Sequence, residues 1–397
     1  MTSLRMPAAA LGLSTAFALL SAQGALALEA EAFGERLQAL AASQGADLEW
    51  TGITVSGDTV TLEGVTAGAA GQDARVPLGE LVLEEVTEEG DGFRVGSISA
   101  PSYTYSDDEA DVAVEGLTIT GLFLPGDDSA GPLGGLMMYE SAELDSVTVT
   151  AKGAQVFAMS GVHAEINAPE GDEPFGIAAS VEEFSADLSQ AEDPQAREAV
   201  EALGYSTLSG SMEMAAQWQP TDGRATLEQM DISIDDAGTL GVSIDLGGYT
   251  PEFAKAVQEM QAKSATASEE EKSAQGLAML GLMQQLTFHG ATISFDDESL
   301  TGKVLDYVAE QQNMKRADIA NLAKAVMPLY LAQLNNPEFS ASVTEAVSAF
   351  LDNPESFSIS AQPANPVPFA LLFAGAMTAP EALVRQLGVT VTANEAE

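Results

Sequence analysis

The two histidines, His163 and His289, are the side chains best suited to transfer protons near neutral pH. Each lies in a short strand-like or turn-like stretch, residues 159–166 and 288–290, without a catalytic sequence context. Nucleophilic catalysis also needs a nucleophile and an orienting group, yet the sequence has no cysteine and no G-x-S-x-G motif. We therefore predict no catalytic residue and no cofactor, and a protein that is not an enzyme.

The densest group of acidic residues is a candidate cation site formed by Asp107, Asp108, Glu109 and Asp111. Calcium binds where several hard oxygen ligands converge, but this cluster does not match the spacing of a calcium loop. A solvated acidic turn is the main interpretation, and a calcium site is the alternative. Paired carboxylates also perform general acid and base chemistry, which leaves a carboxylate-based hydrolase as a further alternative.

Charge restricts the possible partners. The 60 acidic residues against 15 basic ones give a formal net charge of -45. Nucleic acid is excluded as a partner because phosphate binding needs a basic surface. The acidic residues are spread evenly, which favours a role in solubility, and a cationic partner or a divalent cation is the alternative.

The first residues have the three-part pattern of a secretory signal peptide. Arg5 precedes an apolar stretch at residues 8–22, and the small residues Ala25 and Ala27 flank Leu26 in a cleavage site. We predict a signal peptide over residues 1–27, cleavage near Ala27, export to the periplasm, and no transmembrane span after cleavage. The apolar stretch is short for a bilayer span, and an uncleaved anchor is the alternative.

The mature chain is predicted to begin with a helix over residues 28–44, on which Phe33, Leu37 and Leu40 share a face. The next two hundred residues are rich in Val, Thr, Ile and Leu between Gly and Asp turns, which indicates strands. Residues 211–246 predict a three-stranded antiparallel meander with a bulge near Gln229.

One face of this meander is apolar and must be covered by its own curl, a second sheet, helices or a ligand. Core packing is the main interpretation of its methionines and other apolar residues, and ligand binding is the alternative because methionine adapts to varied ligands. The candidate residues for a hydrophobic ligand are Met212, Met214, Trp218, Ile232, Ile234, Leu240, Val242 and Ile244.

These patterns predict an α+β fold with one or more long antiparallel meander sheets, curled or sandwiched, and a helical C-terminal part packed on them. The predicted parts are a β-rich body over residues 28–248 and a mainly helical part with a few strands over residues 249–397.

The meander resembles the strand pattern of AsmA-like and related uncharacterised periplasmic proteins of Gram-negative bacteria. The matching pieces are Leu208-Ser209-Gly210-Ser211, the turn Asp222-Gly223, the strand Ile232-Ser233-Ile234 and Gly238-Thr239-Leu240-Gly241. The resemblance covers about half of the chain and implies long antiparallel sheets around an apolar groove, with a link to lipid transport or envelope upkeep. The chain is shorter than the larger members, and the resemblance carries over no catalytic residue.

The sequence therefore predicts a non-enzymatic periplasmic protein that binds a lipid, another hydrophobic ligand or an envelope protein. A structural or protein-interaction module of the cell envelope is the alternative. The sequence does not identify the ligand, the partner or the oligomeric state.

Overall fold

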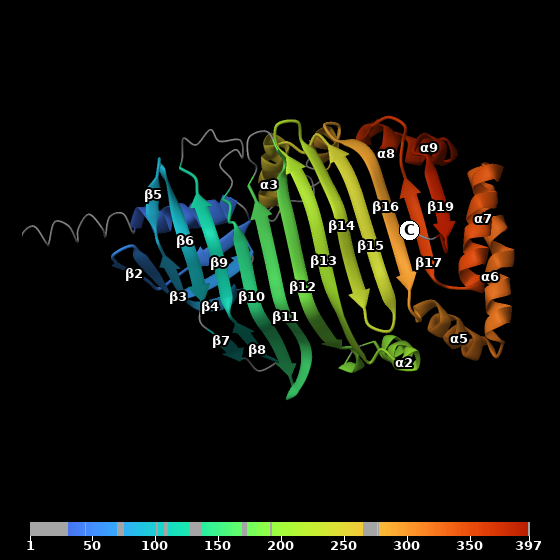
Figure 1. The fold of residues 1–397 in the computed structure, drawn as a ribbon, viewed down its shortest axis with the longest axis horizontal. Helices are drawn as coiled ribbons and strands as arrows, with labels where there is room; N and C mark the ends of the chain where they lie inside the picture. The colour runs from blue at the N-terminus through green and yellow to red at the C-terminus, as the bar shows by residue number, and fades with distance from the viewer. Residues whose placement is uncertain are drawn as a thin grey trace, which may run out of the picture. The chain divides into compact units, whose positions relative to one another are not determined.

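The computed structural model describes residues 31–43, 45–69, 75–100, 102–106, 110–126, 137–168, 173–190, 193–264, 276 and 278–395. Within them the chain forms strands β1 to β19, which pair antiparallel, and several helices between the strands (Figure 1). The chain divides into two compact units. The described residues of the first are 31–43, 45–69, 75–100, 118–126 and 137–139, and those of the second are 102–106, 110–117, 140–168, 173–190, 193–264, 276 and 278–395.

The first unit is a sheet covered by a helix at residues 31–43. Its strands are β1 (Ala46–Glu49), β2 (Gly52–Ser56), β3 (Thr59–Ala69), β4 (Arg75–Glu84), β5 (Thr87–Glu89), β6 (Gly92–Ala100) and β9 (Leu117–Leu124). Strand β3 pairs with β1, β2 and β4, and β4 pairs with β6. Phe33, Leu37 and Leu40 of the helix are buried in one core with side chains of β3, β4, β6 and β9, which confirms the predicted helical face.

The second unit is built on a longer meander, in which β10 to β17 lie side by side as a broad open sheet (Figure 1). Its strands are β7 (Tyr103–Ser106), β8 (Ala110–Glu115), β10 (Ser141–Ala151), β11 (Ala154–Asn167), β12 (Phe175–Asp187), β13 (Thr207–Gln219), β14 (Arg224–Ile234), β15 (Gly238–Gly247), β16 (Thr287–Asp297), β17 (Ser356–Ala361), β18 (Val367–Pro368) and β19 (Val389–Ala393). Strand β19 pairs with β17, and β18 pairs with the start of β16.

The helices of the second unit lie between its strands along the sequence. They are η1 (Leu188–Gln190), α2 (Pro194–Leu203), α3 (Pro251–Ser264), a turn of helix at residues 278–283, α5 (Leu300–Gln312), α6 (Arg316–Leu331), η2 (Ala332–Leu334), α7 (Pro337–Asp352), α8 (Phe369–Thr378) and α9 (Pro380–Gln386). Helix α7 packs through Val343 and Ala346 on Val391 of β19 and Phe357 of β17.

The predicted α+β class with a curled or sandwiched sheet and a helical C-terminal part packed on it is wrong. The structure is mostly a large antiparallel sheet that is not curled, and its helices are scattered along the chain. The apolar helical stripes after residue 248 suggested a helical layer, but β16, β17 and β19 alternate with those helices and extend the sheet. Strand β15, which ends at Gly247, pairs with β16, so strands from both sides of residue 248 belong to one unit.

Candidate functional site

Strand register brings the eight predicted ligand-binding residues onto one face of three neighbouring strands. Met212 of β13 pairs with Ile232 of β14, which pairs with Leu240 of β15. Because side chains alternate between the two faces of a strand, the other members at even spacing share this side. The complete set on the face is Met212, Met214, Trp218, Ile232, Ile234, Leu240, Val242 and Ile244. Their role in binding stays a prediction.

A β-bulge keeps the apolar side chains of β14 on this face. Ala215 pairs with Gln229 and the next residue, Ala216, pairs with Leu227, so Glu228 is the extra residue. This confirms the bulge predicted near Gln229. Without it, Leu227 would point to the opposite face from Met230, because the two residues are an odd number of positions apart.

The apolar face continues onto β16 and β17, which the sequence patterns did not assign to the site. Val242 pairs with Ile293 of β16, and Ile293 pairs with Ile359 of β17. These side chains are not buried: Leu240 is 41% exposed, Ile293 53% and Ile359 44%. Ile293 and Phe295 share one side of β16 because side chains alternate along a strand. The sequence pattern would therefore have predicted the extension if the pairing of β16 with β15 had been known.

A pocket of about 280 Å³ hollows one end of the face. The residues that line it include Ile177, Ala216, Leu227, Ile244, Trp218 and Tyr249. The pocket therefore joins two of the predicted ligand residues, Trp218 and Ile244, to residues of β12 and β14.

Aromatic packing positions two of the side chains that line this pocket, Trp218 and Tyr249. The Trp218 ring centroid lies 5.9 Å from that of Phe175 and 6.3 Å from that of Tyr249, and Tyr249 lies 5.4 Å from Phe253 of α3. The indole N–H of Trp218 donates to the carbonyl oxygen of Tyr249 at 2.7 Å. Since its one polar group is already paired, Trp218 offers an apolar ring to the pocket.

The opposite face of the same strands is polar and holds a second hollow of about 460 Å³, which Thr226, Glu228, Asp245 and His289 help to line. Arg224 forms an ion pair with Asp245. Burial lowers the pKa of His289 from its ordinary value of 6.5, Arg224 lowers it further, and Asp245 opposes the change. A neutral imidazole near neutral pH follows, and it lies 3.1 Å from the Thr287 hydroxyl.

The other predicted chemical groups that the structure describes, His163 and Asp111, are not gathered into a site. His163 lies on β11 within 3.6 Å of Glu143 and 3.8 Å of Glu165, and its side chain is exposed. Asp111 is an exposed residue of β8, whereas Asp107, Asp108 and Glu109 lie outside the described residues. Within the described part of the chain, no three His, Cys, Asp or Glu side chains are grouped to hold a metal ion.

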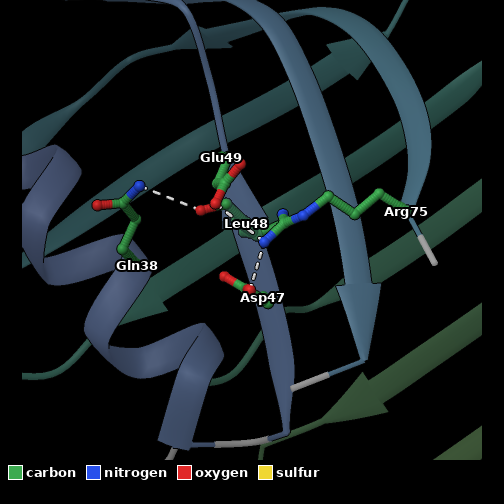
Figure 2. A network of polar contacts seen from close by, with 5 residues as sticks. All are labelled: Gln38, Asp47, Leu48, Glu49 and Arg75. Atoms are coloured by element: carbon green, nitrogen blue, oxygen red, sulfur yellow. Dashed lines mark hydrogen bonds and ion pairs between the residues drawn. The ribbon is translucent and has the colours of Figure 1, made fainter. Parts of the chain in front are cut away.

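The first unit contains a separate polar network (Figure 2). Arg75 of β4 reaches Asp47 at 2.5 Å and Glu49 at 2.9 Å, both on β1. Gln38 of the N-terminal helix donates to the carbonyl oxygen of Leu48 at 3.1 Å. These contacts join the helix and β4 to the short strand β1, which indicates a structural role.

Comparison with protein families finds one model, described as "Uncharacterized protein", that matches residues 231–394. The match begins in β14 and includes β15 to β19 and α8, and therefore part of the apolar face. The search of curated proteins finds no match. Neither finding links the chain to AsmA-like proteins, and that resemblance stays a prediction.

Of the helices in the described residues, none is long and apolar enough to cross a bilayer. The predicted signal peptide at residues 1–27 lies outside the described residues.

Proposed function

We propose that this chain is an exported periplasmic protein without enzymatic activity that binds a lipid or similar hydrophobic ligand along the apolar face of β13 to β17. The observation that carries the proposal is the exposure of Leu240, Ile293 and Ile359 on one continuous side of the sheet. Contiguous exposed apolar surface is unfavourable in water and is typical of interaction sites.

The pocket at Trp218 supports a ligand with a long apolar part. Its lining is almost wholly apolar, and the face continues from it across neighbouring strands through Ile244, Val242 and Ile293. A ligand held by this surface gains affinity mainly from removal of apolar area from water, at about 25 cal/mol per Å². An acyl chain, which carries no polar group along its length, suits such a surface.

Charge argues for a neutral or zwitterionic head group. The chain has a formal net charge of -45, so an anionic amphiphile would approach against a repulsive potential. The signal peptide predicted at residues 1–27 supports a periplasmic location, where phospholipids with neutral head groups are available at the membranes.

The first test is native mass spectrometry of the purified protein, followed by organic extraction of bound molecules. We expect a co-purified phospholipid with a neutral or zwitterionic head group. The second test is calorimetric titration with lysophosphatidylcholine below its micelle concentration. The double variant Leu240→Gln, Ile293→Gln should bind at least about tenfold more weakly, because both side chains lie on the exposed face.

The matched control is Ser294→Gln, which places the same side chain on the opposite face of the strand that carries Ile293. Its affinity should equal that of the wild type. A wild-type protein that carries no lipid and does not bind lysophosphatidylcholine would exclude lipid binding. Equal losses in the double variant and in Ser294→Gln would show that the apolar face is not the site.

A further inference from the structure

Tyr249 lies between the end of β15 and the start of α3, and both of its backbone polar groups are paired. Its N–H donates to the carbonyl oxygen of Gly223 at 2.8 Å, and its carbonyl oxygen accepts from the indole N–H of Trp218 at 2.7 Å. A Cβ atom at Gly223 would lie 2.7 Å from the Tyr249 nitrogen, so this close approach depends on glycine at position 223. The backbone of Tyr249 is therefore fixed beside the strands that form the apolar pocket.

The ring of Tyr249 is fixed as well. Its centroid lies 6.3 Å from that of Trp218, in an edge-to-face arrangement, and 5.4 Å from that of Phe253 on α3. Phe253 is buried, so the ring rests on a residue that is itself held in place. Contacts with two aromatic neighbours restrict the ring to its position at the pocket.

The phenolic hydroxyl of Tyr249 is left available to a ligand. Among the residues that the structure describes, no group forms a hydrogen bond with it, and Tyr249 is 39% exposed. The lining of the pocket is almost wholly apolar, so the hydroxyl lies beside the apolar lining and not within it. The pocket therefore combines an apolar interior with a rigidly held hydroxyl, which can donate a hydrogen bond.

We propose that Tyr249 determines which apolar molecules the pocket prefers, because its hydroxyl donates a hydrogen bond to an ester or phosphodiester oxygen at the head of a bound acyl chain. The chain itself lies against side chains such as Leu227 and Ile244. Ligand sites are typically apolar with a few placed polar groups that fix the orientation of the ligand. This inference rests on the proposed function for the apolar ligand and adds the group that recognises its head.

The absence of charge at the pocket agrees with this role. None of the described residues that line it is charged. A lysine or arginine would form charge-assisted hydrogen bonds and favour an anionic head group. A tyrosine hydroxyl is a neutral donor and binds an acceptor oxygen without requiring net charge on the ligand. The donor therefore matches the neutral or zwitterionic head group that the net charge of the chain favours.

The test is a pair of titrations of the purified protein. One uses lysophosphatidylcholine below its micelle concentration, and the other uses the fluorescent hydrocarbon diphenylhexatriene, which has no acceptor oxygen. Tyr249→Phe removes the hydroxyl and keeps the ring. It should bind lysophosphatidylcholine about three- to tenfold more weakly than the wild type, because one hydrogen bond is lost. It should bind diphenylhexatriene with wild-type affinity.

The matched control is Tyr105→Phe on β7, which removes the same hydroxyl from a tyrosine that is 40% exposed and does not line the pocket. It should bind both probes as the wild type does. An ether-linked analogue of lysophosphatidylcholine, which lacks the ester carbonyl, then locates the acceptor. The same loss in Tyr249→Phe with this analogue assigns a phosphodiester oxygen, and no loss assigns the ester carbonyl.

Three results would overturn the inference in distinguishable ways. Equal affinities of the wild type and Tyr249→Phe for lysophosphatidylcholine would exclude recognition by the hydroxyl and leave the ligand site standing. An equal loss for both probes, or the same loss in Tyr105→Phe, would show that a change in packing and not a hydrogen bond weakens binding. A wild type that binds neither probe would overturn the proposed function, and this inference with it.

Discussion

The strands of both units have one apolar face, but this face is covered in the first unit and exposed in the second. In the first unit the helix at residues 31–43 covers the sheet, and Leu83 and Leu124 are 0% exposed. In the second unit Ile293 and its neighbours on β15 and β17 remain half exposed. The difference shows that an alternating strand pattern specifies an apolar face but does not specify what covers it.

The comparison also separates two uses of apolar residues. A covered face contributes to folding because its side chains leave water when the chain folds. An exposed face contributes little to folding, and its apolar area stays available to a ligand or a membrane. Stability measurements on the two faces therefore distinguish a core from a binding surface.

The largest expected effect is on the covered face. Leu83→Ala should lower the free energy of unfolding of the first unit by about 3 kcal/mol, because it leaves a cavity in a closed core. Ile293→Ala should lower that of the second unit by less than about 1 kcal/mol, because the side chain is already half in water. Urea unfolding measures both.

The two tryptophans make this comparison possible in one chain. Trp50 packs against the core of the first unit, and Trp218 lies in the second. Unfolding followed by Trp50 fluorescence in Trp218→Phe, and by Trp218 fluorescence in Trp50→Phe, reports on each unit in turn. Equal losses for Leu83→Ala and Ile293→Ala would contradict the distinction between the two faces.

The sequence was informative where local chemistry determines structure. The helical face of Phe33, Leu37 and Leu40, the three-stranded meander and the bulge near Gln229 all depend on residues close in sequence, and the structure confirms them. The apolar side of β13, β14 and β15 was also predictable, because alternation and tight turns fix the register of neighbouring strands.

Long-range pairing was not predictable from these patterns. Strands β16 and β17 are separated by α5, α6 and α7 in the sequence yet pair directly in the sheet. The apolar helical stripe that includes Val343 and Val347 was predicted correctly. Helix α7 nevertheless packs on two strands at the end of the sheet and does not form a layer over it. Tyr249, which helps to line the pocket, lies in a loop without a periodic pattern and gave no sequence signal.

A smaller effect is expected at the ion pairs. Arg75 pairs with Gly68 in register, and Gly68 pairs with Asp47, so the arginine reaches across a residue that has no side chain. Arg75→Met should lower the stability of the first unit by about 0.5–1 kcal/mol, less at high salt, because its carboxylate partners are solvent-exposed.

Arg224→Met is the corresponding change in the second unit, where the arginine pairs with Asp245. Urea unfolding with the two tryptophan reporters, at low and high salt, compares the two pairs. A loss above about 2 kcal/mol for Arg75→Met would mean that the network in Figure 2 is more than a surface ion pair.

The smallest expected effect is a change in the free energy of unfolding with pH, caused by a histidine of the second unit. Both histidines, His163 and His289, lie in the second unit. Because the pKa of His289 is lowered in the folded protein, the unfolded chain binds a proton below pH 6.5 that the folded protein does not bind. The free energy of unfolding of the second unit should therefore fall as the pH falls below 6.5, and this contribution becomes constant below the lowered pKa.

Urea unfolding followed by Trp218 between about pH 7.5 and pH 5 tests this response. His289→Gln should remove the part of the slope that His289 causes, and Arg224→Met should reduce it, because Arg224 helps to lower that pKa. His163→Gln controls for the loss of a histidine from an exposed strand position. A slope that is unchanged in His289→Gln would show that the imidazole is as free to bind a proton in the folded sheet as in the unfolded chain.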